Sequence, residues 1–275
     1  MEYLKKNYSL ESPDVPLLFD QLSFWSAGFG QLLMEHVPMQ KGMTVLDVGF
    51  GSGFPLIELA QCLGNQSKLF GIDIWQEGRK RAKWKIEKTG LKNVELVEGD
   101  AASMPFEKEY FDLIVSNLGI NNFAEPQRVC NECFRVLKKN GKFCLTTNLV
   151  GHFQEFYQLY ESVLKELDLG AYISAMQEQI AHRGTDFSIR ELLETAGFSI
   201  VKMVRNRFQM RFVDGTALLN HLLVVVGFLP GWRSILPDEK TSEVFALLEN
   251  KLNEQAEWQG ELKMSVPMLY VEALK

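Results

Sequence analysis

A glycine-rich turn constrains the fold of this chain more than any other feature. An apolar run typical of a buried strand, Thr44–Val48, leads directly into Gly49, Gly51 and Gly53, and a helical pattern follows over Phe54–Leu63. Glycines allow a tight turn and let a ligand approach the backbone closely. The segment therefore predicts a strand, a ligand-holding turn and a helix in immediate succession.

The same alternation of strand and helix continues through the next hundred residues. Strands that alternate with helices at this spacing indicate a parallel sheet covered on both faces. We expect an α/β protein with a doubly wound, mostly parallel, seven-stranded sheet. The expected strands are 44–48, 69–74, 94–97, 111–116, 142–147, 198–204 and 266–273, and the expected helices of this core are 54–63, 76–89, 125–137 and 188–196.

Helical patterns outside this alternation suggest additions to the core. An amphipathic stretch over 17–36 predicts an N-terminal helical segment, residues 1–40, that caps the site, while 41–275 forms the main domain. Further helices are expected at 153–167, 172–181, 216–228 and 240–257. We interpret 149–187 and 213–262 as helical insertions that form lids over a site at the carboxyl ends of the strands.

The spacing of the glycines separates two classes of ligand. A dinucleotide-binding turn needs G-x-G-x-x-G, but the third glycine position is occupied by Phe54. Asp47 also lies two residues before Gly49, where a carboxylate would repel a pyrophosphate and suits a cationic ligand. A dinucleotide-dependent oxidoreductase is therefore disfavoured, although it stays an alternative.

The turn resembles the first motif of class I S-adenosylmethionine (SAM) dependent methyltransferases, and four further segments resemble later motifs in the family's order. Together they are most similar to the group that contains the ubiquinone and menaquinone methyltransferases. The resemblance implies a Rossmann-like methyltransferase fold, SAM as cofactor and S-adenosyl-L-homocysteine as its product. The matching segments are Val45–Pro55, Gly71–Trp75, Glu98–Phe106, Phe111–Asn117 and Arg135–Lys142.

The resemblance also implies which residues bind the adenosine part of the cofactor. Asp73, at the end of the second strand, would accept hydrogen bonds from the ribose hydroxyls, with Ile74 and Trp75 beside it. Asp100 would meet the adenine amino group, and Ala101 would contact the edge of the adenine ring.

Other residues are implied at the methionine end of the cofactor. Asp47 would interact with the methionine ammonium group, and Asn117 and Leu118 would border that end. The backbone of the turn would pack against the amino-acid part and the ribose. The turn residues are Gly49, Phe50, Gly51 and Gly53.

The methyl acceptor is less constrained by the sequence. The N-P-P-Y or D-P-P-Y motif, typical of methylation of amino groups on bases and glutamine, is absent after the fourth expected strand. Trp25 and Tyr157 could line an apolar pocket or serve as ordinary core aromatics. The candidate acceptor-site residues are Trp25, Asn121, Asn122, Tyr157, His182, Arg183 and His221.

Several of these candidates have a simpler structural interpretation. Asn121 and Asn122 suit a cap of the following helix. His182 and Arg183 could supply a base and an anion contact, or form the polar end of a helix. His221 lies in an apolar run and fits a hydrogen-bonded core histidine.

Composition limits the partners and the compartment. The net charge is −6, and the densest basic run, between Arg79 and Lys85, fits a solvated helix surface, so no nucleic-acid partner is expected. No apolar run reaches the length of a membrane span and the N-terminus lacks a signal-peptide pattern, so we expect a cytoplasmic protein with reduced thiols. Cys130 and Cys133 fit one buried helix face, and no metal site is expected.

We therefore expect a SAM-dependent methyltransferase that acts on a small, partly apolar molecule. The alternatives are a SAM-binding protein without catalytic activity, and a methyltransferase that acts on protein or RNA. The atom that is methylated, the use of a general base and the oligomeric state do not follow from the sequence.

Overall fold

The computed structural model describes residues 1–6, 8–21 and 24–275, and its internal contacts divide the chain into two compact units. The core unit comprises Leu10–Asn148, Gly184–Asn206 and Met268–Lys275. The helical unit comprises Met1–Ser9, Leu149–Arg183 and Arg207–Pro267. Each unit is described by itself below.

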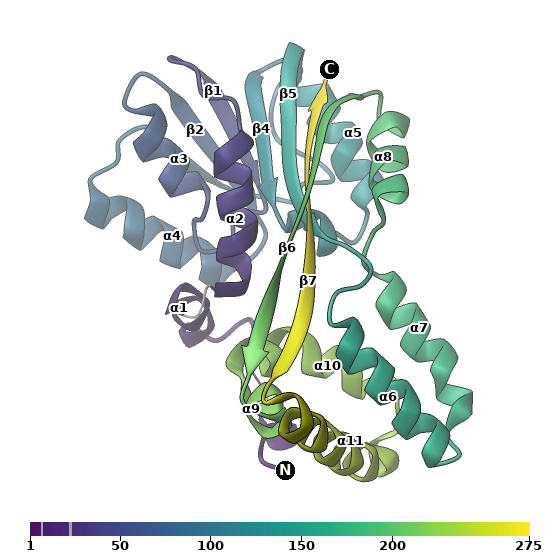
Figure 1. Cartoon of the computed structure of the whole chain (residues 1–275). Helices are drawn as coiled ribbons and strands as arrows, with labels where there is room; N and C mark the ends of the chain where they lie inside the picture. Colours follow the sequence, from purple (N-terminus) through teal and green to yellow (C-terminus); the bar gives the residue numbers. More distant parts are fainter. Residues whose placement is uncertain (7, 22–23) are drawn as a thin grey trace. The chain divides into compact units, whose positions relative to one another are not determined.

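One seven-stranded sheet has the strand order β3-β2-β1-β4-β5-β7-β6 (Figure 1). The pairs from β3 to β5 are parallel, and β5 pairs antiparallel with β7. The mostly parallel α/β sheet expected from the sequence is thus confirmed. The strands are β1 (Thr44–Val48), β2 (Lys68–Asp73), β3 (Val94–Glu98), β4 (Phe111–Asn117), β5 (Leu137–Asn148), β6 (Ser199–Phe212) and β7 (Leu262–Leu274).

The register of the parallel strands brings the expected site residues to one edge. Val48 pairs with Ile72, and Asp73 pairs with Glu98, so β1, β2 and β3 end side by side. The glycine turn therefore leaves the sheet next to the end of β2. The strand order reverses between β1 and β4, and the carboxyl edge at such a reversal is the usual ligand site of these folds.

The helices of the core unit confirm the expected positions. Helix α4 has the bounds predicted from the sequence, and α3 and α5 differ from their predictions by one or two residues at the ends. Helix α3 packs on β2, α4 on β3 and α5 on β5. The helices of this unit are α1 (Asp14–Gln21), α2 (Phe24–His36), α3 (Leu56–Leu63), α4 (Gln76–Thr89), α5 (Pro126–Val136) and α8 (Asp186–Thr195). Positions 22–23 of the helix expected over 17–36 lie outside the described residues.

Two strands are longer than predicted. Strand β5 already pairs at Leu137, opposite Phe111, and its next pair joins Lys142 to Leu113. The intervening residues form a bulge in which Asn140 has a φ of 62°, so they do not form the predicted turn between helix and strand. Strand β6 continues to Phe212 because apolar residues keep a period of two in this segment.

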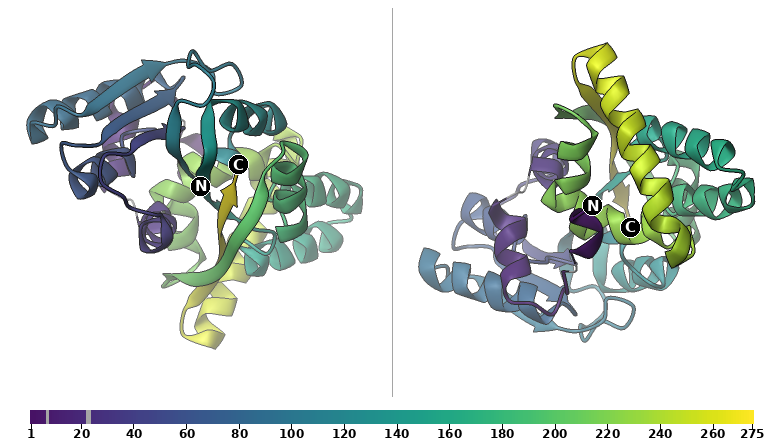
Figure 2. Two further views of the ribbon diagram at one scale, coloured as in Figure 1. Left: turned by 90° about the horizontal axis from the view of Figure 1, so that it is seen from above. Right: turned by 90° about the horizontal axis from the view of Figure 1, so that it is seen from below.

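The helical unit contains α6 (Gln154–Glu166), α7 (Ile173–Ala181), α9 (Gly215–Asn220), α10 (Leu229–Arg233) and α11 (Asp238–Gln259). Helix α11, in yellow-green, runs beside α6 (Figure 2). No described helix of the chain is long and apolar enough to cross a membrane.

The single helix predicted over 216–228 is wrong. Helix α9 ends at Asn220 because His221 is extended, with φ −62° and ψ 129°, and a π-helix follows over Val224–Phe228. Three successive valines in this run are weak helix formers, which favours the break. Helix α10, which carries a proline in its first turn, was not predicted.

Candidate functional site: a cofactor cleft at the end of the sheet

The glycine turn adopts backbone conformations that explain its glycines. The φ angles of Gly49, Gly51 and Gly53 are 79°, 54° and 108°, all in the region that disfavours residues with a side chain. A Cβ atom on Gly53 would also lie 2.6 Å from Cδ1 of Ile57. The turn thus passes closely over the start of α3 and leaves its backbone open to a ligand.

Asp73 holds this turn in place. One carboxylate oxygen accepts a hydrogen bond from the N–H of Gly51 at 2.7 Å, and the other accepts one from the N–H of Trp75 at 2.7 Å. A carboxylate has about four acceptor positions, so two stay available for the hydroxyls of a ribose. Asp73 therefore holds the glycine turn and also offers acceptors to a ribose. The resemblance implied only the contact with the ribose.

A cavity of about 230 Å³ lies beside this carboxylate within the core unit. Of the predicted cofactor residues, Gly49, Asp73, Ile74, Asp100 and Ala101 line it. The acceptor candidate Asn122 also lines this cavity. The lining residues that were not predicted are Ile72, Gly99, Ala102, Phe123, Ala124, Glu125 and Val129.

Two predicted cofactor residues, Phe50 and Trp75, direct their side chains away from this cavity. The side chain of Phe50 is buried under β2, where a Cβ on Gly71 would meet its ring, so only its backbone faces the turn. The Trp75 ring lies over Gly51 and Gly78 and is absent from the described cavity lining.

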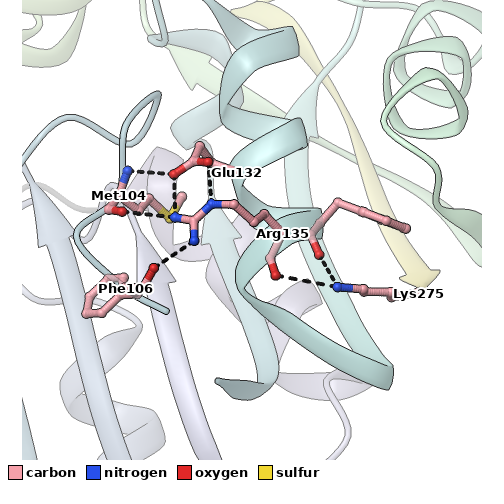
Figure 3. Close-up of polar contacts among 6 residues, drawn as sticks. Met104, Phe106, Glu132, Arg135 and Lys275 are labelled. Atoms are coloured by element: carbon pink, nitrogen blue, oxygen red, sulfur yellow. Dashed lines mark hydrogen bonds and ion pairs between the residues drawn. The ribbon is translucent and has the colours of Figure 1, made fainter. Parts of the chain in front are cut away.

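Arg135 anchors the loop that follows Asp100 (Figure 3). Its guanidinium donates hydrogen bonds to the carbonyl oxygens of Met104 at 3.0 Å and Phe106 at 2.7 Å. It also pairs with Glu132, whose carboxylate accepts the N–H of Met104 at 2.7 Å. Both charged side chains come from α5, so this helix positions the expected adenine-binding loop. The sequence showed Arg135 only as part of a motif, with no indication of this role.

Asp47 is a buried carboxyl group with no counter-ion among the described residues. Its side chain is 0% exposed, and neither oxygen has a well-formed hydrogen bond to any described residue. Burial and the negative charge of Asp73 raise the pKa of Asp47 to about 8, while the nearby backbone amide of Leu56 opposes the shift weakly. A cationic ligand group nearby would stabilise the carboxylate, which fits the expected methionine ammonium and sulfonium.

The asparagines after β4 do not cap the next helix, and that prediction is wrong. Helix α5 begins at Pro126, four residues beyond Asn122, and its N-cap residue makes no side-chain cap. Asn121 instead donates to Asn148 at 2.6 Å and accepts from Thr147 at 2.5 Å. Asn122 donates to the carbonyl of Leu118 at 3.3 Å.

The end of β4 is also tied to its neighbours in the sheet. Asn117 accepts a hydrogen bond from Thr146 at 2.7 Å, and Leu118 has a φ of 66°. Gly119 follows at a position where a Cβ would lie 2.4 Å from Oγ of Ser116. Close packing therefore fixes the backbone where the methionine end of a cofactor is expected.

Comparison with known proteins decides the family. A family model described as a methyltransferase domain matches residues 39–197, more than half of the chain. The chain belongs to this family. It is a SAM-dependent methyltransferase of class I, in agreement with the five motifs.

Individual relatives agree with this assignment. The chain is 31% identical to a demethylmenaquinone methyltransferase of Oceanobacillus iheyensis over 62% of this chain and 75% of the relative. A crystal structure of a putative methyltransferase from Bacillus halodurans, 23% identical, superposes with a TM-score of 0.58 and covers 90% of this chain and 98% of the other. A SAM-dependent methyltransferase from Aquifex aeolicus, also 23% identical, has a TM-score of 0.55 over 70% of this chain and 92% of the other. These structural likenesses support the fold.

The methyltransferase uses SAM, whose sulfonium supplies an electrophilic methyl group. The cavity beside Asp73 and the uncompensated carboxyl of Asp47 fit the ribose and the cationic end of that cofactor. Transfer of the methyl group is a direct displacement, so the protein contributes mainly by aligning the reactants.

The methyltransferase has a further anchor on its cofactor turn that sequence reasoning missed. Asp20, on α1, accepts hydrogen bonds from Ser52 of the turn at 2.8 Å, from Arg81 at 2.7 Å and from Lys85 at 2.5 Å. Three hydrogen bonds to these groups lower the pKa of Asp20 although burial opposes them. The indole N–H of Trp75 donates to the carbonyl of Leu10 at 2.6 Å.

These contacts correct the interpretation of the basic run as a solvated surface. Arg79 forms an ion pair with Glu98, and Arg81 and Lys85 pair with Asp20, so three of its cations are half-buried. The sequence did not reveal these ion pairs because the acidic partners lie 19 to 65 residues away along the chain.

The acceptor candidates fall into both units. Trp25, in the core unit, packs against Phe29 with ring centroids 4.8 Å apart. In the helical unit, Tyr157 accepts a hydrogen bond from Trp232 and Arg183 donates one to Gln179, whereas His182 is exposed.

His221 is not the hydrogen-bonded core histidine that we expected. It is half-buried, and its buried Nδ1 has no hydrogen-bond partner in the described parts of the chain. Burial lowers its pKa below the ordinary value. The break between α9 and the π-helix places it at a turn rather than within a helix.

His152, which was not predicted, lies near Phe228 and Arg183. It is 2% exposed and stacks on Phe153, with centroids 4.3 Å apart and planes at 6°. Burial, and secondly the charge of Arg183, hold the pKa of His152 well below its ordinary range, so the ring is neutral at pH 7. In the sequence His152 is an isolated histidine after a strand, and no pattern around it indicated that it would be buried near a cation.

Proposed function

We propose that this methyltransferase transfers a methyl group from SAM to a small, partly apolar molecule with a quinone-like ring. The observation that carries the proposal is the match to demethylmenaquinone methyltransferases, whose length the chain covers by three quarters. A ring of that kind needs a mostly apolar site with few polar groups.

The helical unit offers side chains of this kind. Phe156 and Trp232 stack with centroids 3.8 Å apart, and Phe228 lies near the same indole ring. The polar groups among the described rings are few: the imidazole of His152, the hydroxyls of Tyr157 and Tyr160, and the guanidinium of Arg183. This composition supports an acceptor that combines an apolar ring with a polar substituent.

We also propose that the N-terminal segment, residues 1–40, covers the bound cofactor and that the helical insertions at 149–187 and 213–262 act as lids. The contact between Asp20 and Ser52 supports the first part, since it joins α1 to the cofactor turn within the core unit. Limited proteolysis with and without S-adenosylhomocysteine tests it: the ligand should slow cleavage before residue 40.

Two measurements test the proposed function in sequence. Calorimetric titration with SAM, S-adenosylhomocysteine and NAD should show micromolar binding of the adenosyl ligands only; binding of NAD alone would establish the oxidoreductase alternative. The protein is then incubated with SAM and a reduced, short-chain demethylmenaquinone, and mass spectrometry should detect a product heavier by one methylene.

Controls separate the remaining alternatives. The Asp73→Ala variant should lose both cofactor binding and product, whereas exposed Lys83→Ala should retain both. Binding of SAM without transfer to any ring compound would overturn the acceptor proposal and favour a SAM-binding protein. Transfer of labelled methyl groups to protein or RNA would favour the macromolecular alternative.

A further inference from the structure

Arg183 is a half-buried cation with no acidic partner in the part of the chain that the structure describes. It follows α7, and one guanidinium nitrogen donates to the carbonyl of Gln179 at 2.8 Å. Its Cζ lies 6.0 Å from the centroid of the Phe228 ring. Within the described residues no carboxylate lies within ion-pair distance of Arg183.

Seven of the ten arginines form an ion pair with an aspartate or glutamate: Arg79, Arg81, Arg128, Arg135, Arg190, Arg205 and Arg211. Arg233, which is also half-buried, donates instead to the carbonyl of Leu4 at 3.1 Å. A cation that is partly removed from water without a counter-ion favours the arrival of an anion. Arg183 therefore differs from these arginines in a way that points to a ligand.

Tyr157 adds a second donor at the same place. Its hydroxyl oxygen accepts a hydrogen bond from the indole N–H of Trp232 at 3.0 Å, and the Trp232 ring stacks with Phe228, which faces the guanidinium of Arg183. None of the described residues accepts the hydroxyl proton, so this proton is left to be donated. The guanidinium of Arg183 likewise keeps N–H groups beyond the one directed to Gln179.

The charge of the surroundings selects the kind of anion. His152 is neutral, and Arg183 is the charged group that acts on both His152 and Tyr157. One positive charge among aromatic rings matches one negative charge, whereas a dianion such as a phosphate monoester would bring an uncompensated charge into this apolar setting.

We propose that Arg183 and Tyr157 form a binding subsite for a singly charged oxygen acid, of which a carboxylate is the simplest, on a ligand with an adjacent apolar group. Both residues belong to the helical unit. The planar guanidinium donates two parallel hydrogen bonds to the two oxygens, and the Tyr157 hydroxyl donates a third.

The experiment uses the full chain saturated with S-adenosylhomocysteine, and ligand-observed NMR at millimolar concentrations measures probe binding. The probes are 4-phenylbutyrate, its uncharged amide and phenyl phosphate. The wild type should bind the carboxylate at least about tenfold more tightly than the amide, and more tightly than the phosphate. Equal binding of carboxylate and amide, or no binding of the carboxylate, overturns the proposal.

Variants assign the effect to the subsite. Arg183→Gln should remove the preference for the carboxylate, and Tyr157→Phe should reduce it severalfold without altering the fold. Arg211→Gln is the matched control, because Arg211 belongs to the same unit and is paired with Glu261. A preference that persists in both Arg183→Gln and Tyr157→Phe contradicts the subsite.

The same samples separate this inference from the proposed function. Binding of S-adenosylhomocysteine and methylation of the quinone-like ring are measured independently of the probes. A wild type that shows neither S-adenosylhomocysteine binding nor methylation would count against the proposed function. The preference for the carboxylate probe by itself decides whether the subsite exists.

Discussion

Replacing Asp47 with asparagine should stabilise the unliganded methyltransferase at neutral pH and weaken its affinity for SAM. In the folded chain the carboxyl is fully buried, and its pKa is raised to about 8 from an ordinary value of 3.8. At pH 7 the folded protein therefore keeps this proton, whereas the unfolded chain has released it. Asparagine has nearly the same shape and carries no ionisable proton.

The magnitude follows from the linkage between proton binding and folding. Because the pKa is raised in the folded state, the favourable contribution of Asp47 is fully present below pH 3.8 and is lost as the pH rises toward 8. At about 1.36 kcal/mol for each pH unit, the loss between pH 3.8 and pH 7 is about 4 kcal/mol. The variant should be more stable than the wild type at pH 7 by up to that amount.

Urea denaturation of the unliganded proteins at pH 5 and pH 7 tests the first half of the prediction. The wild type should lose about 3 kcal/mol more than Asp47→Asn between these two pH values. Equal losses in the two proteins would show that Asp47 does not carry this proton.

Calorimetry tests the second half. A cationic ligand near Asp47 should lower its pKa, so that binding of SAM at pH 7 releases a proton to the buffer. The measured enthalpy should then differ between phosphate and Tris for the wild type, and the Asp47→Asn variant should bind more weakly with no such proton release. An enthalpy independent of the buffer in the wild type would refute the assigned role.

Three further predictions concern single side chains. Asp73→Ala should weaken binding of S-adenosylhomocysteine by about 1–3 kcal/mol in a calorimetric titration, because it removes acceptors for the ribose and the bond to Gly51; unchanged affinity would contradict both roles. Gly53→Ala should lower the urea midpoint by more than Gly51→Ala, since its Cβ meets Ile57 at 2.6 Å, whereas the nearest atom at Gly51 is 4.0 Å away; the reverse order would be inconsistent with the turn. The free energy of unfolding of the wild type should fall as the pH drops below 6.5, because the unfolded chain protonates His152 while the depressed pKa keeps the buried ring neutral. The His152→Phe variant should show a weaker fall in urea denaturation. The same dependence on pH in both proteins would show that His152 does not cause the fall.

Local patterns in the sequence predicted the elements that build the cofactor cleft. The strand Thr44–Val48 and the helix Gln76–Thr89 have the predicted bounds, because their apolar periodicity, their flanking glycines and the turn between them act over short distances. The predicted residues Gly49, Asp73 and Asp100 line one cavity because parallel strands end at a common edge.

Other features depend on partners that are distant in the sequence. The anchoring of the adenine-side loop by Arg135, and that of the cofactor turn by Asp20, join segments about 30 residues apart. The bulge at Asn140 arises from pairing with β4, and the break at His221 arises despite an apolar run that suits a helix. No local pattern carries such information.

The sequence by itself determined the class of the fold, the family and the cofactor, because each is written in short motifs whose residue types are demanded by local geometry: glycines at positive φ, and an acid at a strand end. The tertiary structure decided which charges are compensated. It paired Arg79, Arg81 and Lys85 with distant acids, left Asp47 and Arg183 without an oppositely charged partner among the described residues, and thereby distinguished structural charges from those available to a ligand. The physical reason is that the free energy of a buried charge depends on its neighbours in space, which the order of residues along the chain does not reveal.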